Sequence, residues 1–171
     1  MTFFVILGSA LSFLAAAASM EFVARWMHRY VMHGCGWCLH NDHHTTTGRR
    51  FQRNDLYALF FAVTSFALIY SGLRFSIAPV ASAGFGVALY GVGYVLFHDI
   101  MFHKRVKWIK VRPFHPYLQR IVNAHRIHHS TVTKDGARSF SFLWAPRQYD
   151  PRYNPKYGEQ LREIRRLQAK H

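Results

Sequence analysis

Three long stretches without charged residues constrain what this chain can fold into. Thr2–Met20 contains 19 consecutive uncharged residues, Leu56–Leu73 contains 18, and Phe75–Phe97 contains 23. A helix rises about 1.5 Å per residue, so each stretch has about the length needed to cross the ~30 Å hydrocarbon layer of a bilayer. Only Arg74 separates the second stretch from the third. The pattern predicts an all-α integral membrane protein with about three transmembrane helices, at residues 2–20, 56–73 and 75–97.

The charged residues are concentrated outside these stretches. The chain has 22 Lys and Arg against 8 Asp and Glu, a formal net charge of +14. Three spans place the N-terminus on one side of the membrane and every basic residue except Arg74 on the other side. The positive-inside rule makes that basic side cytoplasmic. Because no compact basic fold remains outside the spans, the charge favours an anionic lipid surface and an acidic protein partner, and not nucleic acid.

The domain organisation follows from the same pattern. The first stretch lacks the basic residues that begin a secretory signal peptide, so we expect an uncleaved anchor. We expect residues 1–146 to form a single membrane-bound domain, and residues 147–171 to form a basic cytoplasmic tail.

Twelve histidines in 171 residues are the strongest indication of chemistry. Ten of them form an H-x4-H pair and an H-x2-H-H triplet before the second span, and a second pair and triplet after the third. The members are His28 and His33; His40, His43 and His44; His98 and His103; and His125, His128 and His129. The three-span topology brings all four clusters to the cytoplasmic side, at or just beyond helix ends. His115 and His171 lie outside the clusters, and we expect no special role for them.

Helical periodicity indicates how each cluster can present its imidazoles. In H-x2-H-H, offsets of three and four residues bring three side chains onto one helix face. In H-x4-H, an offset of five residues separates two side chains by about 140° on an ideal helix. Such a pair either flanks a site or converges through a bulge, and the spacing leaves both open. We expect the first helix to continue to Gly34, because no Gly or Pro interrupts Glu21–His33, and a later helix to cover Tyr117–His129 after Pro116.

The imidazoles predict a pair of metal ions. Neutral imidazole suits zinc, copper, iron and nickel, whereas calcium and magnesium prefer oxygen ligands. Ten nitrogens are too many for one zinc ion with about four ligands. Two ions with four or five nitrogens each would use them all, and iron is the expected metal for O2 chemistry. A few nearby side chains could orient the rings by accepting their other N–H: Glu21, Asp42, Asn54, Asp55 and Asp99. Asn54 and Asp55 also begin the second span, so a helix cap is their first interpretation.

The sequence around the clusters resembles the membrane-bound fatty acid hydroxylase/sterol desaturase superfamily, and within it the carotenoid branch of bacterial-type β-carotene 3-hydroxylases. The likeness extends over residues 20–146, and the spacing matches at every clustered histidine. Besides the histidines it includes Glu21–Trp26, Asn54-Asp55, His98–Arg105, Ala124–Ser130 and Ser139–Pro146.

The resemblance implies a non-haem di-iron monooxygenase that uses O2 and two electrons, with reduced ferredoxin as the donor. The implied reaction is hydroxylation of the β-ionone rings of β-carotene at C3 and C3′, giving zeaxanthin via β-cryptoxanthin. Some members would also accept ketolated substrates. The protein would lie in a bacterial inner membrane, with its N-terminus outside and its histidines facing the cytoplasm.

Two further sets of residues are candidates for binding the substrate and the partner. Five aromatic residues near the clusters could line the substrate channel, with an interfacial belt as the alternative: Trp26, Tyr30, Tyr94, Phe97 and Phe102. A basic run could bind the electron donor or phospholipid headgroups: Lys104, Arg105, Lys107, Lys110 and Arg112.

Other functions account for the pattern less well. A fatty-acid, sterol or sphingolipid hydroxylase or desaturase of the same superfamily would share the metal site and differ in the lining of the cavity. A metal transporter would place ionisable groups near the bilayer midplane, but only Arg74 is charged between Leu56 and Phe97. Cys35 and Cys38 form a C-x-x-C, a redox motif in thioredoxin-like proteins, but the sequence assigns it no role between two histidine clusters.

Overall fold

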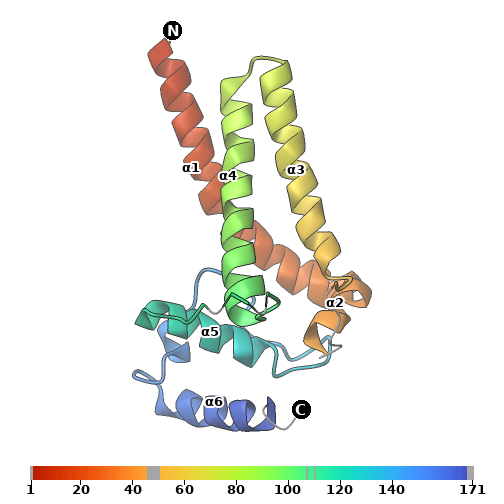
Figure 1. Ribbon diagram of the computed structural model, residues 1–171, viewed down its shortest axis with the longest axis vertical. Helices are drawn as coiled ribbons and strands as arrows, with labels where there is room; N and C mark the ends of the chain where they lie inside the picture. Colours follow the sequence, from red (N-terminus) through yellow and green to blue (C-terminus); the bar gives the residue numbers. More distant parts are fainter. Residues whose placement is uncertain (1, 46–50, 107, 110, 169–171) are drawn as a thin grey trace.

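The computed structural model describes residues 2–45, 51–106, 108–109 and 111–168, and in this part of the chain the regular elements are all helices. They are α1 (Thr2–Trp26), η1 (Met27–Cys35), α2 (Trp37–His44), α3 (Asp55–Arg74), α4 (Ala78–Tyr94), η2 (Val95–Phe102), α5 (Pro116–His128), η3 (Arg147–Tyr149) and α6 (Pro155–Gln168). The N-terminus and the α3–α4 turn lie at one end of the molecule, and α2, α5 and α6 gather at the other end (Figure 1).

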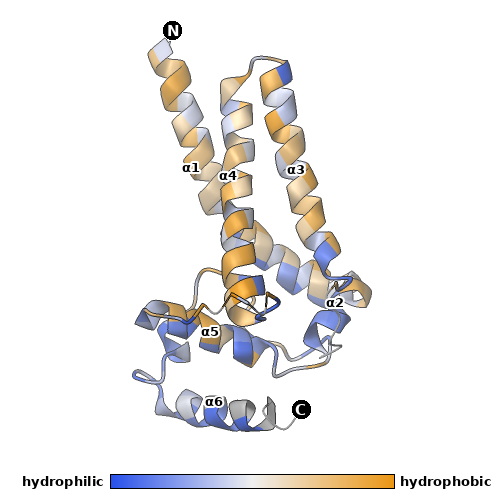
Figure 2. Cartoon of the chain, in the orientation of Figure 1, coloured by the Kyte–Doolittle hydropathy of each residue, from blue (hydrophilic) through white to orange (hydrophobic). Residues whose placement is uncertain are grey.

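Among the described residues, three helices are long and apolar enough to cross a membrane: Thr2–Cys35, Asp55–Arg74 and Ala78–Phe102. Figure 2 shows that the three long helices are mostly hydrophobic, whereas α2, α5 and α6 are more hydrophilic. The prediction of an all-α protein with three spans is confirmed.

The third span begins later than the predicted Phe75, because residues 75–77 form the turn between α3 and α4. The N–H of Ile77 donates to the carbonyl oxygen of Gly72 at 2.8 Å, and Ser76 has a left-handed φ of 56°. This is the hydrogen-bond pattern of a Schellman helix end. Pro79 then lies in the first turn of α4, where its missing N–H costs nothing.

The two segments that carry the H-x4-H pairs are π-helical. η1 continues α1, which extends the first helix to Cys35, one residue past the predicted end, and η2 continues α4. The N–H of His103 donates to the carbonyl of His98, five residues earlier, at 3.0 Å. In the same way, the N–H of Gly36 donates to Val31 at 2.8 Å. Each pair therefore converges through a widened turn, which decides between the two arrangements that the spacing left open.

Small residues bring the three spans into close contact, with α4 between α1 and α3 (Figure 1). A Cβ atom at Gly86 would lie 2.4 Å from the carbonyl oxygen of Phe13, and one at Gly84 would lie 2.8 Å from the backbone nitrogen of Ile69. The hydroxyl of Ser65 donates to the Gly84 carbonyl at 2.9 Å. Such backbone proximity is the usual way in which membrane helices associate.

The segment predicted to be a tail packs against α5. Tyr149 is 4% exposed and belongs to a hydrophobic cluster with Ile121, Ala124 and Ile127 of α5, and Tyr157 of α6 packs against the same cluster. The compact part of the chain therefore continues past the predicted boundary at residue 146. Two tyrosines eight residues apart form no periodic apolar pattern, which is why the sequence did not indicate this contact.

Gly86→Ala should weaken the contact between α1 and α4. The added methyl group would force the two backbones apart, and overpacking of this kind costs about 1–3 kcal/mol. We expect the melting temperature of the detergent-solubilised protein to fall by several degrees. Gly91→Ala is the matched control, because nothing lies within 4 Å of its new methyl group. Equal melting temperatures for the two variants would contradict the close approach at Gly86.

Candidate metal centre

The ten clustered histidines come together where the three spanning helices meet α2 and α5. Nine of them form two groups in which the candidate ligand atoms lie within 4.8 Å of one another. The first histidine group contains His28, His33, His40, His44 and His128, and the second contains His43, His103, His125 and His129. His98 lies beside the second group, with its Nε2 3.0 Å from the Nε2 of His43. The structure thus assembles all ten of the predicted ligands.

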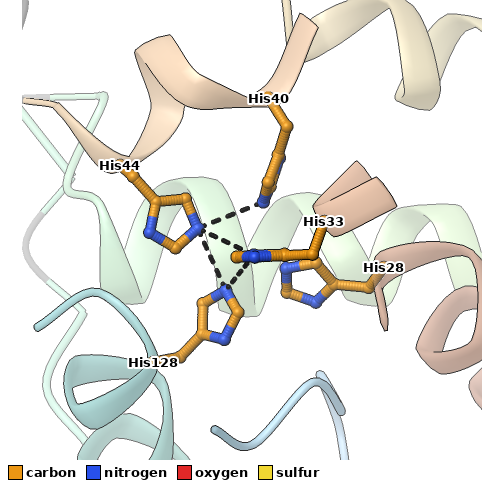
Figure 3. A group of neighbouring side chains, drawn as sticks. All are labelled: His28, His33, His40, His44 and His128. Atoms are coloured by element: carbon orange, nitrogen blue, oxygen red, sulfur yellow. Dashed lines mark hydrogen bonds between the residues drawn. The ribbon is translucent and has the colours of Figure 1, made fainter. Parts of the chain in front are cut away.

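Each group draws on several helices. In the first group, His28 and His33 come from η1, His40 and His44 from α2, and His128 from α5; their rings converge (Figure 3). In the second group, His43 comes from α2, His103 from the end of η2, and His125 and His129 from the end of α5. The two groups therefore have the same composition: an H-x4-H pair (counting His98), the outer members of one triplet, and the middle member of the other.

Each H-x2-H-H triplet is divided between the two groups. On a helix, the residues at i+3 and i+4 lie about 60° and 40° to either side of residue i. His43 and His44 are consequently about 100° apart around α2, and they face different groups. The sequence left open which histidine belongs to which ion, and the structure divides the single helix face of each triplet between the two groups.

Hydrogen bonds at Nδ1 determine which ring nitrogen faces each centre. Seven Nδ1 atoms lie 2.6–3.0 Å from oxygen atoms that only accept hydrogen bonds. The pairs are His28 with the carbonyl of Phe140, His33 with that of Lys134, His44 with that of Thr131, His128 with that of Arg138, and His40, His43 and His98 with the side chains of Asn54, Gln52 and Asp99. The proton of each ring is therefore on Nδ1, and a lone pair on Nε2 points to the centre.

The distances between these Nε2 atoms fit ligands of a metal ion. The Nε2 of His44 lies 3.2 Å from those of His33 and His40, and 3.1 Å from that of His128. Two nitrogens that are each about 2.1 Å from one ion, at 90° to each other, lie about 3.0 Å apart. Nε2 atoms without protons cannot hydrogen-bond to one another, so a cation bound between them would stabilise this arrangement.

Two buried imidazole nitrogens have no hydrogen-bond partner among the described residues: the Nε2 of His28 in the first group and that of His129 in the second. An unsatisfied buried polar atom costs about 1–3 kcal/mol. A metal–nitrogen bond at each centre would remove that cost. The ligands are imidazoles without a carboxylate, which suits iron, copper, zinc or nickel. The residues present therefore fit two metal ions.

Burial keeps the imidazoles in the neutral form that metal binding requires. Desolvation lowers the pKa of His40 from 6.5 to about 2, and that of His44 to about 4. Desolvation, together with neighbouring imidazoles, also lowers the pKa of His125, His128 and His129. These rings can accept a metal ion near neutral pH without first releasing a proton.

Two of the five side chains predicted to orient the rings contact one. Asn54 accepts from His40 at 2.6 Å, and Asp99 accepts from His98 at 2.8 Å. The interpretation of Asn54 as a helix cap is wrong, because its side chain makes no cap hydrogen bond to α3. Its oxygen is directed toward α2 and not toward the start of its own helix.

The other three predicted side chains hydrogen-bond to groups other than the imidazole rings. Asp42 accepts the backbone N–H of Arg53 at 2.8 Å, and Asp55 pairs with Arg105 at 2.7 Å. Arg105 also reaches Asp99 at 3.4 Å, so it is engaged within the protein instead of being free in the predicted basic patch. Lys107 and Lys110 of that patch, like His171, lie outside the described residues. Glu21 hydrogen-bonds to the segment that carries Phe142, as described below.

The orienting groups that the sequence did not indicate are one amide and four backbone carbonyls. Gln52 accepts from His43, and the carbonyls belong to the loop at residues 131–140 that follows the last cluster. Backbone acceptors leave no residue-type signal, so no pattern could have identified them. Gln52, an amide within ten residues of the second cluster, could have been included among the candidates. Cys35 and Cys38 are free and exposed, and neither belongs to a histidine group.

An apolar cavity of about 740 Å³ lies between α1, α3 and α4, and two aromatic residues of its wall separate it from the histidines. Leu59 and Val92 in its wall are 56% and 57% exposed, so the cavity opens sideways to the surroundings of the spans. At its inner end, Tyr94 stacks on His98 with ring centroids 4.3 Å apart, and Phe142 stacks on His28 at 5.0 Å. An apolar molecule dissolved in the bilayer could therefore reach the aromatic rings that pack on these two histidines without crossing water.

Of the five aromatic residues predicted to line a channel, only Tyr94 belongs to the cavity wall. Trp26 and Tyr30 are 58% and 56% exposed and lie on the outer surface. The wall uses Met20 and Ala24 of α1, and Trp26, two residues further, lies about 200° away around the helix. Phe97 and Phe102 are also outside the wall; Phe102 stacks on His125 at 4.6 Å.

Fold and site together define a membrane protein that binds metal through histidines beside a cavity open to lipid. The chain belongs to the fatty acid hydroxylase family, whose family model matches residues 13–145. It is 40% identical to the beta-carotene hydroxylase of Pantoea ananas over 139 residues, which cover 81% of this chain and 78% of that protein.

Other relatives carry the same name. The chain is 38% identical to the beta-carotene hydroxylase of Pseudescherichia vulneris over 83% of its length and 80% of that protein. It is 36% identical to the chloroplastic beta-carotene 3-hydroxylase 2 of Arabidopsis thaliana, over 71% of this chain and 41% of that protein. No solved structure matches the chain. These relatives and the family match confirm the resemblance that the histidine spacing indicated.

The division of the triplets can be tested by double substitutions. His44→Ala with His128→Ala removes two ligands from the first group and none from the second, so one metal ion should become easy to chelate while the other keeps its wild-type affinity. His43→Ala with His44→Ala removes one ligand from each group, so both ions should become easier to chelate. A chelator titration followed by metal analysis distinguishes the two patterns. Equal weakening of both ions in the first variant would contradict two separate groups.

Acidification should destabilise the metal-free protein. The pKa values of His40 and His44 are lower in the folded state than the unfolded value of 6.5. The unfolded chain therefore binds more protons, and folding stability decreases as the pH falls below about 6.5, continuing to about 4 for His44. The melting temperature of chelator-treated protein should be lower at about pH 5 than at about pH 7.5. A higher value at the acidic pH would show that these rings are not held neutral.

Proposed function

We propose that this protein is a β-carotene hydroxylase: a non-haem di-iron monooxygenase that hydroxylates the β-ionone rings at C3 and C3′, giving zeaxanthin through β-cryptoxanthin. The observation that carries the proposal is the apolar, laterally open cavity, whose wall residues Tyr94 and Phe142 pack directly on His98 and His28. The printed names of the relatives support the substrate. Each hydroxylation converts a C–H bond, O2, two electrons and two protons into a C–OH group and water.

Residues of the cavity wall would bind the substrate, and oxygen atoms around the histidines would orient the imidazoles that bind the metal ions. Two iron ions, one at each histidine group, would supply the oxidant that an unactivated ring C–H bond requires. The apolar wall of the cavity takes up a rod-shaped hydrocarbon directly from the bilayer and excludes water from its end ring. Carbonyl and side-chain oxygens fix the ring orientations through Nδ1, so that the lone pairs are in place before a metal binds.

We further propose that the electrons come from reduced ferredoxin, and that the protein lies in a bacterial inner membrane with its histidines on the cytoplasmic side. The basic excess on the histidine side of the spans supports this orientation. It also supports an acidic donor. Lys104 and Arg112 of the predicted docking patch are exposed, whereas Arg105 is paired with Asp55 and Asp99.

Fatty-acid hydroxylation is the second candidate, because the matching family model carries that description. An apolar cavity open to lipid would also accept an acyl chain, and the metal centre would be the same. The names of the relatives favour the carotenoid. A host that produces β-carotene contains both substrates, so one extract distinguishes hydroxylated pigment from hydroxylated fatty acid.

In a bacterial host that makes β-carotene, expression of this chain should convert the pigment to β-cryptoxanthin and zeaxanthin in an oxygen-dependent way. His43→Ala should reduce this conversion at least about 100-fold, because it removes a ligand of the second group. His115→Asn is the control, because His115 lies outside both groups and an asparagine can still cap α5. Pigments are measured by chromatography, and membrane levels by immunoblot. Zeaxanthin formation that survives in His43→Ala would contradict the di-metal assignment.

A further inference from the structure

The proposed reaction requires the enzyme to hydroxylate one ring carbon, C3, and not its neighbour C4. The inference about how it does so rests on the proposed function. In a β-ionone ring, C4 is next to the ring double bond, so its C–H bonds are weaker than those at C3. C3 lies opposite the carbon that carries the polyene and is therefore the tip of the molecule. An enzyme that hydroxylates C3 must overcome the greater reactivity of C4, and it can do so by placing the ring.

Phe142 lies between the cavity and the histidines, where a side chain can determine how the substrate ring is placed. Its ring lies in the cavity wall, is 4% exposed, and stacks on His28 with centroids 5.0 Å apart and planes at 15°. The same ring approaches His98, beside the second group, at 5.5 Å, and Tyr94 at 5.1 Å. Phe142 thus packs against His28 of the first group and against His98, which lies beside the second group.

Phe142 is held in place by a carboxylate from a spanning helix. Glu21 of α1 accepts the backbone N–H of Phe142 at 3.0 Å and that of Leu143 at 3.1 Å. The hydroxyl of Tyr90 donates to the same carboxylate at 2.8 Å, and that of Tyr117 donates to the carbonyl of Leu143 at 2.6 Å. The segment has no regular secondary structure, so these side-chain contacts fix the ring position.

We propose that Phe142 is the specificity-determining residue of this hydroxylase. It forms the stop at the end of the cavity, and Glu21 is the residue that positions it. A rod that enters along the spans meets the ring of Phe142 with its tip, which is C3. With the stop in place, the substrate can neither slide further in nor tilt, and C4 stays away from the metals. Removal of the stop lets the ring advance or rotate, and the weaker C4–H bond then competes.

The test is the position of the new hydroxyl group. Phe142→Leu and Phe142→Ala should raise the ratio of 4-hydroxy to 3-hydroxy product at least about tenfold, with the larger effect for alanine. Glu21→Gln keeps the ring but weakens its support, and should shift the ratio in the same direction by less. Phe60→Leu is the matched control, since Phe60 lies on α3 near the cavity but is 56% exposed and is not part of its wall. It should form only the C3 product.

The variants are purified from the β-carotene host, and metal content is measured beside the product positions. Metal content close to wild type together with a C4 shift supports the proposal. Product at C3 alone from both Phe142 variants overturns it, and so does complete inactivity of both with the metal retained. Loss of metal from all three variants would show that the segment is structural, and this would also overturn the proposal. A wild-type protein that hydroxylates no carotenoid would instead refute the proposed function itself.

Discussion

The rest of the structure depends on the need to bring ten imidazole nitrogens together without protonating them. Neutral rings with their lone pairs facing one another are stable only around cations, so the fold must supply burial, a defined tautomer and room for metal at the same time. Burial by α2, η1, η2 and α5 lowers the pKa of rings such as His44 to about 4. Oxygen atoms at Nδ1 determine the tautomer in seven of the ten rings.

The backbone is irregular where this requirement demands it. An α-helix would direct His98 and His103 about 140° apart, and the π-helical turn at the end of α4 brings both to the second centre. The triplets remain α-helical and serve both centres because adjacent residues diverge by about 100°. Two π-helical pairs and two α-helical triplets therefore make two centres of similar composition from four short clusters.

The sequence predicted the spans and the ten histidines because both depend on residue type and spacing. It could not assign His43 and His44 to different groups, since that depends on where α5 and η2 approach α2. The carbonyls of the loop at residues 131–140 have no residue-type signal, and the packing of Tyr149 on α5 has no periodicity. The exposure of Trp26, in contrast, could have been predicted once the cavity-facing side of α1 is known, because helix geometry fixes its angle to Met20 and Ala24.

Glu21 shows how the membrane part and the metal part are joined. A carboxylate in an otherwise apolar helix is costly at membrane depth unless it is fully hydrogen-bonded. Glu21 accepts hydrogen bonds from Tyr90 on α4 and from the backbone of the segment after the last histidine cluster. It therefore connects the helices that form the cavity to the segment whose Phe140 carbonyl orients His28 and whose Phe142 ring lines the cavity. Because one side chain makes these contacts, a shift of α1 relative to α4 would move the wall of the cavity and the ring of His28 together, and the close backbone contact of these two helices at Gly86 opposes such a shift.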